Sequence, residues 1–379
     1  MIQMSELTAF LTPAVLTFLV ITAGCFLGRV KLHGMSLDLA GVLICAVTAG
    51  WLIGLSPLGA DAAYISSVTA GMKTLSSLGT AIFVPTVGIS AGYSFGGLCR
   101  KNLLYFFFGG AMVLTGLLLV RGVWLIDREV SVSALLGILC GSLTSTPGMS
   151  AASEIPGICA EEVALGYGSS YVFGVVFVVL FVQLLTRGEK KGTEKKAPAR
   201  NREPVKARGF LEQIGLAVIG GSLAGQVKLP FSSASLGTSG GMLCVGAAIG
   251  FLIRTYFPSA VRSGQTAAVF RNLGLVFFFA GSGIPAGLRS GGTGHPRWLL
   301  YGIGFTLVPV LTGYVICRIL GCTNAQTGAI LAGGMTSTPA AGVLLDRNEN
   351  FDLSAYTTVY VGALMTMVVG IRYFCSFYA

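Results

Sequence analysis

Apolar stretches of close to twenty residues recur along the whole chain, and this repetition constrains the fold more than any other feature. A helix needs about twenty apolar residues to cross the hydrocarbon core of a bilayer. Only 11% of the residues are charged, whereas a soluble domain has about 25%. The sequence therefore predicts an all-α polytopic membrane protein, and it excludes a cytosolic enzyme, a nucleic-acid-binding protein and a disordered tail protein.

The densest basic charge lies in one polar segment. Residues 187–208 hold nine of the 25 Lys and Arg, beside three Glu, and have no apolar periodicity. We expect a linker there, which the positive-inside rule puts in the cytoplasm. The net charge of +10 therefore indicates orientation rather than an acidic partner. The expected organisation is a first membrane repeat over 1–186, the linker over 187–208 and a second membrane repeat over 209–379.

The two halves contain similar segments in the same order. The matched segments are 28–32 with 225–229, 40–53 with 240–253, 78–92 with 273–287, and 141–149 with 333–341. Two tyrosines follow the last match in each half, Tyr167 and Tyr171 in the first and Tyr356 and Tyr360 in the second. Because the order agrees throughout, the sequence predicts two structurally similar halves.

Each half contains five full-length apolar spans and one interrupted segment. The expected spans are 10–28, 39–55, 75–95, 103–126, 163–186, 210–226, 237–256, 269–288, 298–320 and 353–377. The interrupted segments, 132–152 and 326–345, are each broken by Pro, Gly and hydroxyl side chains. If they cross the membrane, each half has six spans and the halves are parallel. If they dip in and return, each half has five spans and the halves are inverted.

The placement of charge favours the inverted arrangement. With a cytoplasmic linker and five spans per half, both termini lie outside and the acidic Asp127 and Glu129 also lie outside. Four basic residues of the first half then lie inside, namely Arg29, Lys31, Arg100 and Lys101. Lys228, Arg289 and Arg297 remain outside as exceptions. We therefore expect two inverted repeats in the plasma (inner) membrane, each with five transmembrane helices and one re-entrant hairpin.

Both interrupted segments contain the motif TSTP. Its proline cannot donate a backbone hydrogen bond, so the entering helix should end near the first Thr, and the second Thr should cap a following half-helix. A half-helix N-terminus binds anions, and carbonyls ending the first half-helix can coordinate sodium. The alternative is a purely structural role, in which the motif is a capped kink at a helix junction. The candidate substrate-binding residues of the motif are Thr144, Ser145, Thr146, Pro147, Thr336, Ser337, Thr338 and Pro339.

GSLTSTPGM at 141–149 and GGMTSTPAA at 333–341, each after a glycine-rich span of its own half, resemble the duplicated membrane domain of the aspartate:alanine exchanger family. The resemblance covers nearly all of the chain apart from the linker. It implies a secondary transporter that exchanges amino acids or small carboxylates, an elevator-type movement and a homodimer. Larger members carry soluble regulatory domains between the halves, whereas here only the basic linker occupies that place.

Ionisable residues in or beside apolar spans are functional candidates. Arg271 offers a guanidinium to a solute carboxylate, with a positive-inside anchor as the alternative. Arg121 sits near a span end, where it can snorkel outward, and Lys73 is expected in a loop before a span. Glu154 and Asp346 occupy equivalent places after TSTP, where they either couple an ion or proton or form a charge at the hairpin mouth.

The glycines Gly88, Gly92, Gly283 and Gly287 favour close helix packing over a sliding surface. The chain has few His, no CxxC pair and no credible acid–base pair. We therefore expect no enzyme and no metal or other cofactor, apart from possible coupling to sodium or protons. We expect a secondary active transporter of small anionic substrates such as amino acids or dicarboxylates, with alternating access at a site between the TSTP tips. The alternative is an ion-selective channel that uses the hydroxyl-lined breaks as a filter.

Overall fold

The computed structural model describes residues 10–29, 31–32, 35–36, 39–94, 100–186, 207–228, 235–257, 264–290, 296–337, 340–341, 344 and 353–376. These residues are mostly helical, and β1 (Lys31–Leu32) pairs antiparallel with β2 (Met35–Ser36). The first half contains α2 (Pro13–Gly28), α3 (Ala40–Leu55), the 3₁₀ helix η1 (Pro57–Ala60), α4 (Ala62–Ser94), α5 (Arg100–Ile126), α6 (Val132–Ser142), α7 (Thr146–Ser153) and α8 (Ala160–Leu185). The second contains α9 (Ala207–Ala224), α10 (Thr238–Tyr256), α11 (Gly264–Ser290), α12 (Pro296–Ile319), α13 (Asn324–Gly334) and α15 (Leu353–Ser376).

Seven of the described helices are long and apolar enough to cross a membrane, namely α4, α5, α8, α10, α11, α12 and α15. The apolar helices α2 and α3 are shorter. Large hydrophobic side chains point outward on several helices, for example Leu118, Leu216 and Ile319. An apolar exterior on helices of this length is the surface that a bilayer covers. The expected all-α polytopic membrane protein is confirmed at this level.

The helix α4 corrects one expectation. It begins at Ala62, where Asp61 Oδ1 accepts hydrogen bonds from the backbone N–H groups of Ala63 and Tyr64, each at 3.0 Å. An aspartate at this position satisfies N–H groups that have no partner within the helix. Lys73 therefore lies on an exposed face inside a 33-residue helix, and the expectation of a loop there is wrong.

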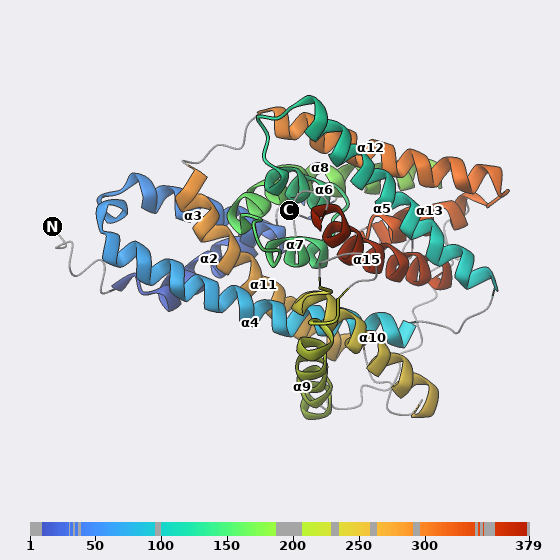
Figure 1. Cartoon of the computed structure of the whole chain (residues 1–379), viewed down its shortest axis with the longest axis horizontal. Coiled ribbons are helices and arrows are strands. Elements are labelled where there is room, and N and C mark those ends of the chain that lie inside the picture. Colours follow the sequence, from blue (N-terminus) through green and yellow to red (C-terminus); the bar gives the residue numbers. More distant parts are fainter. Residues whose placement is uncertain are drawn as a thin grey trace.

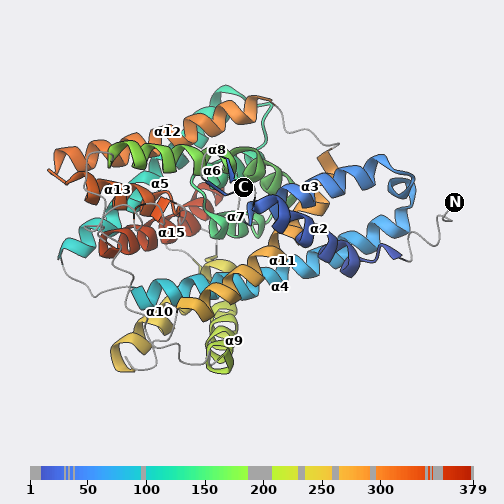
Figure 2. The same cartoon turned by 180° about the vertical axis from the view of Figure 1, so that it is seen from behind.

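The helices form two groups that each combine both halves of the chain (Figure 1). In the first group, α4 and α11 pack against each other, α3 packs on α11, α10 packs on α4, and α2 and α9 lie outside them. The second group contains α5, α6, α7, α8, α12, α13 and α15. The reverse view separates the same groups (Figure 2). Contacts between α8 and α11 and between α7 and α10 join the two groups.

Glycines let the first group pack tightly. A Cβ at Gly92 would lie 2.1 Å from the carbonyl oxygen of Ala247, and one at Gly287 would lie 2.0 Å from that of Val47. Only a residue without a side chain permits such an approach. Both positions lie on repeat-related helix pairs, α4 with α10 and α11 with α3. Close packing, rather than a sliding surface, is therefore the role of these glycines.

The helix pair α6–α7 begins and ends at the same end of α8. The backbone N–H of Cys159, just before α8, donates to Ser133 Oγ at the start of α6 over 3.0 Å. Further along, Gly137 packs against the carbonyl of Val163 and Gly141 against that of Tyr167, so α6 and α8 run in the same direction. Because α8 starts beside the start of α6, α7 and the residues after it return the chain to that end.

Candidate functional site

The chain breaks after α6 and after α13 in one and the same way. Thr144 and Thr336 adopt left-handed backbone angles, with φ of 52° and 47°. In the first break, Thr144 N donates to Gly141 O over 2.9 Å and Ser145 N to Cys140 O over 2.8 Å. This is the Schellman helix ending, in which glycine usually occupies the left-handed position. A β-branched residue there costs about 1–3 kcal/mol, and such strain concentrates at functional sites.

The two breaks hold each other. The Thr144 hydroxyl donates to the carbonyl of Met335 over 2.6 Å, and the Thr336 hydroxyl donates to that of Leu143 over 2.9 Å. Leu143 and Met335 are the C-cap residues of α6 and α13, and carbonyls at that position lack a partner within their own helix. Each half therefore satisfies the last carbonyl of the other, and both threonine hydroxyls are buried.

The capping residue of α7 differs from the expected one. Ser145, with extended backbone angles, accepts a hydrogen bond from Gly148 N over 3.3 Å, and Thr146 is already the first helical residue. The same role falls to Ser337, whose hydroxyl accepts from Ala340 N over 3.4 Å. The expectation that Thr146 caps the helix is wrong because the left-handed residue ahead of Ser145 puts the serine in the capping position. Thr338, Pro339 and Asp346 lie outside the described residues.

Tyrosine pairs flank both breaks. Tyr167 and Tyr171 on α8 stack with ring centres 5.1 Å apart, and Tyr356 and Tyr360 on α15 lie 5.7 Å apart. The Tyr167 hydroxyl is 3.1 Å from that of Thr146. The pairs are equivalent in the repeat, so each break has one aromatic wall of the same composition.

A cavity of about 90 Å³ lies where the breaks meet the first group of helices. Its polar lining comes from both breaks, from the tyrosines and from α11, and consists of Thr144, Thr146, Thr336, Tyr171, Tyr360, Arg271 and Asn272. Pro147 and the apolar Leu39, Phe83, Val87, Leu275 and Phe279 complete it. The space holds a few water molecules or a small solute. The structure thus brings Arg271 together with residues of both TSTP motifs, one of which ends 124 residues before it and the other begins 65 residues after it.

Arg271 is the one charged residue among those lining this cavity. Among the described residues it makes no ion pair or hydrogen bond. A half-buried guanidinium beside hydroxyl groups and the N-terminal end of α7, which Thr146 and Pro147 bring to the cavity, forms an environment that favours an anion. This arrangement could bind a carboxylate through the guanidinium and orient it through the hydroxyls.

Glu154 lies apart from the cavity, at the end of α7. Its carboxylate pairs with Arg372 on α15, with Oε2 3.1 Å from Nη2. It also accepts the backbone N–H of Ser239, at 2.9 Å to Oε2, and the Ser239 hydroxyl at the start of α10. Glu154 therefore ties the first break's return helix to two other helices. Gly237 makes room for this contact, since its φ is 75° and a Cβ there would overlap the Arg372 guanidinium.

Sequence reasoning missed Arg372, Tyr171, Tyr360 and Asn272 as functional candidates. Arg372 lies inside the expected last span at 353–377, and an ionisable residue within an apolar run was the available signal. The tyrosines were matched as repeat equivalents, but nothing in a single sequence shows that they face the breaks. Asn272 carries no signal beyond its place next to Arg271.

Curated relatives of this chain are named transporters. An uncharacterized transporter of Bacteroides thetaiotaomicron is 28% identical over 207 residues, which cover 53% of this chain and 34% of the relative. One of Rhodopirellula baltica is 33% identical over 192 residues, covering 48% and 32%. One of Desulfotalea psychrophila is 27% identical over 190 residues, covering 50% and 32%. The matches therefore span about a third of the length of these relatives.

A family model described as a predicted permease membrane region, Asp-Al_Ex, matches the chain in two parts, residues 16–187 and 213–376. The two parts flank the basic linker and together cover most of the chain. With this match and its apolar helices, the chain is a multi-pass membrane protein. It belongs to the aspartate:alanine exchanger family, as the paired TSTP motifs indicated.

Proposed function

We propose that this protein is a secondary active transporter of small anionic solutes, such as amino acids or dicarboxylates, which bind in the cavity between the two breaks. The main observation in support is that one guanidinium, from Arg271, lines a cavity built from the broken helices of both halves. Binding at broken helices near the centre of a membrane protein is the pattern of transporters with internal repeats. The relatives named transporters support the same function.

The two groups of helices support an elevator-type movement. The cavity lies between them, with the breaks on one side and α4 and α11 on the other. Sliding of the second group against the first would carry the solute between the two faces of the membrane. The strained Thr144 and Thr336 travel as one unit in this proposal, because their hydroxyls bond across the repeat. We further propose a homodimer, in keeping with the resemblance.

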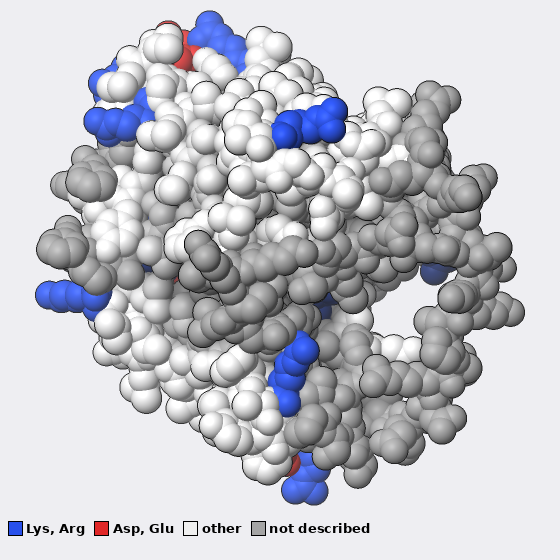
Figure 3. Space-filling model, turned by 90° about the vertical axis from the view of Figure 1, so that its right-hand side faces the viewer, with Lys and Arg blue, Asp and Glu red and all other residues white. Residues whose placement is uncertain are grey.

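The inverted topology is also a proposal. The helix pair α6–α7 starts and ends beside the start of α8, as a re-entrant hairpin would. With five spans per half, the end that carries Arg254 and Arg318 is cytoplasmic, together with the linker, and both termini are outside. Among the described residues, the face shown in Figure 3 carries more Lys and Arg than Asp and Glu, which would suit a cytoplasmic face. The membrane proposed is the plasma membrane.

Sodium or proton coupling would need an oxygen-rich or titratable site. Glu154 is engaged by Arg372 and Ser239, which supports a structural charge at the hairpin mouth over ion coupling. The threonine hydroxyls at the breaks donate to carbonyls, so those carbonyls are occupied in this conformation. We therefore propose exchange without an ion, or coupling that begins after the breaks rearrange.

The test is solute counterflow in proteoliposomes that contain the purified full chain. Vesicles loaded with one unlabelled amino or dicarboxylic acid should take up the same labelled acid, and the uptake should saturate. Absence of exchange across a panel of such acids, with folded protein, contradicts the proposal. Single-channel currents in planar bilayers would instead support the channel. Repeating the assay with and without a sodium gradient, and with a pH gradient, distinguishes exchange from ion coupling.

A further inference from the structure

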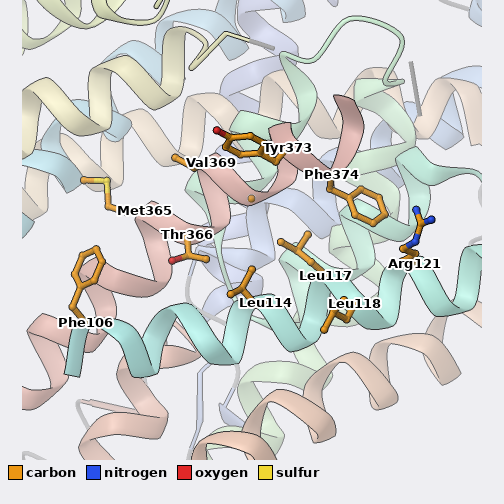
Figure 4. A pocket seen from close by; sticks show the side chains of 11 residues that line it. Phe106, Leu114, Leu117, Leu118, Arg121, Met365, Thr366, Val369, Tyr373 and Phe374 are labelled. Atoms are coloured by element: carbon orange, nitrogen blue, oxygen red, sulfur yellow. The ribbon is translucent and has the colours of Figure 1, made fainter. Parts of the chain in front are cut away.

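A second hollow lies on the outside of the second group, between α5 and α15. It measures about 880 Å³ and is open to the surroundings. Figure 4 shows Leu114, Leu117 and Leu118 of α5 along one side, with Val369 and Phe374 of α15 on the other. Gly370 forms part of its floor, since a Cβ there would lie 2.7 Å from the Leu117 side chain. We call this hollow, with its lining from Phe106 to Arg121 on α5, the α5–α15 groove.

The α5–α15 groove faces hydrocarbon rather than water. Leu114 and Leu118 are 51% and 68% exposed, and both lie on a helix long and apolar enough to cross a bilayer. Its lining is apolar except for Arg121, Thr366 and Tyr373. Such apolar surface is covered by lipid in a membrane protein, and here it forms a concave hollow rather than a flat helix face. An occupant of this groove must therefore present apolar surface to it.

One cation stands at the end of the groove. Arg121 lies at the opposite end from Phe106 (Figure 4), fifteen residues along α5, which corresponds to about 22 Å of helix. Trp124 follows one turn later, with the Arg128 guanidinium 3.6 Å from its ring centre. Tryptophan is typical of the interface between hydrocarbon and headgroups. Arg121 therefore lies near headgroup level, while the groove extends from it towards the membrane centre.

We infer that the α5–α15 groove binds one anionic phospholipid, with an acyl chain along the leucines of α5 and the phosphate at Arg121. One leaflet of the hydrocarbon core is about 15 Å thick, so the groove is long enough for an acyl chain. Arginine offers a planar fork to phosphate oxygens. A phospholipid provides both the apolar chain that the groove fits and the negative charge that Arg121 attracts.

A second copy of the chain fits the groove less well. In a two-fold dimer the same patch faces itself, and the residues lining this groove include Arg121 but no carboxylate. A symmetric contact would bring two guanidinium groups to the interface without an acid from this patch. A free phosphate ion could contact Arg121 but would leave the apolar groove empty. The phospholipid is the occupant that satisfies both features.

Native mass spectrometry of the detergent-purified full chain tests this inference. Phosphatidylglycerol and phosphatidylcholine with identical acyl chains are added in turn, and inorganic phosphate is added alone. We expect one phosphatidylglycerol to bind about fivefold more tightly than phosphatidylcholine, the factor that one arginine near an anionic surface provides. Inorganic phosphate alone should leave no adduct.

Variants separate the headgroup contact from the groove. Arg121→Ala should bring the ratio of the two lipids to about one, and Arg121→Lys should keep part of the preference. Leu118→Trp should fill the groove and weaken the binding of both lipids severalfold. Arg318→Ala and Leu311→Trp, both exposed on α12 outside the groove, should behave as the unchanged protein. Melting temperatures equal to that of the unchanged chain show that each variant is folded.

Two results would overturn the inference. One is an unchanged lipid preference in Arg121→Ala. The other is a lipid-free dimer that Leu118→Trp converts to a monomer, since the groove would then be an interface between copies. Neither result bears on transport through the Arg271 cavity, because the two sites share no lining residue.

Discussion

Glu154 at the end of α7 and Arg372 near the end of α15 form an ion pair, with Oε2 3.1 Å from Nη2. The Arg372 side chain is only 5% exposed, and its Nη1 also donates to the carbonyl of Ser235 over 3.2 Å. The two residues lie 218 positions apart in sequence, so the pair joins helices from opposite halves of the chain. It therefore holds the return arm of the first break against the last helix of the chain.

Removing one partner of this pair should destabilise the fold. Arg372→Met leaves the Glu154 carboxylate, which is 26% exposed, without its cation. Breaking a fully buried pair costs about 3–5 kcal/mol, so we expect a cost at or below the lower end of that range. We expect a clear drop in the melting temperature in detergent. Arg372→Met combined with Glu154→Gln should recover part of the loss, because no charge is then left unpaired. Arg318→Met, at an exposed position, is the matched control, and an equal effect there would contradict the assignment.

The hydroxyls of Thr144 and Thr336 should contribute comparably to stability. Thr144→Val and Thr336→Val each leave a buried carbonyl of the other half unpaired, at a cost of about 1–3 kcal/mol. Thr144→Ser and Thr336→Ser keep the donor and should stay close to the unchanged protein. Thermal unfolding in detergent measures both series. Thr312→Val, which removes an exposed hydroxyl within α12, serves as control, and a loss as large there would count against the paired breaks.

Arg271 should determine solute affinity. A hydrogen bond to a charged group is worth about 1.5–3 kcal/mol, so Arg271→Ala should raise the half-saturating solute concentration in counterflow by about tenfold or more. Arg271→Lys should give a half-saturating concentration between those of the unchanged protein and Arg271→Ala, because lysine keeps the charge but lacks the planar fork. Arg254→Ala provides the control, since its guanidinium bonds to Tyr93 O at a helix end. Unchanged affinity in Arg271→Ala would make Arg271 an orientation anchor only.

Asp127 should make stability depend on acidity. It follows α5 and accepts a hydrogen bond from the Tyr301 hydroxyl over 2.5 Å, with Arg297 Nη1 3.9 Å away. The Tyr301 hydrogen bond is the main cause that lowers the pKa of Asp127 below its ordinary 3.8. A lowered folded pKa gives stability that is present above 3.8 and is lost as the pH falls through the folded value.

Asp127→Asn measures this contribution. The melting temperature of the unchanged protein should exceed that of the variant at pH 7, and the difference should shrink below pH 3.8 and disappear once Asp127 is protonated. Glu129→Gln, which removes an exposed acid nearby and keeps Asp127, is the control and should retain the loss of stability at low pH. A difference in melting temperature between the unchanged protein and Asp127→Asn that stays constant with pH would contradict the prediction.

Much of the architecture follows from the sequence by itself. The ten expected spans all occur as helices, with ends that mostly agree within a few residues, and seven of them are long and apolar enough to cross a membrane. Apolar length is a local property of the chain, which is why the sequence predicts it. The break at TSTP also follows locally, since a proline and a run of hydroxyls disfavour a continuous helix there. The predicted start of α4 was wrong, because this helix extends well beyond its apolar core to Ala62, where Asp61 caps it.

What the sequence determined by itself was the membrane class, the duplication and the two breaks. The membrane class and the breaks depend on residues close together in the chain, and the duplication is visible when one half is compared with the other. Only the tertiary structure decided that Thr144 bonds to Met335 and Thr336 to Leu143, that Arg271 lies beside both motifs, and that Arg372 reaches Glu154. Each of these contacts joins residues more than 60 positions apart. Such contacts depend on how distant helices pack, and apolar residues specify burial without specifying partners.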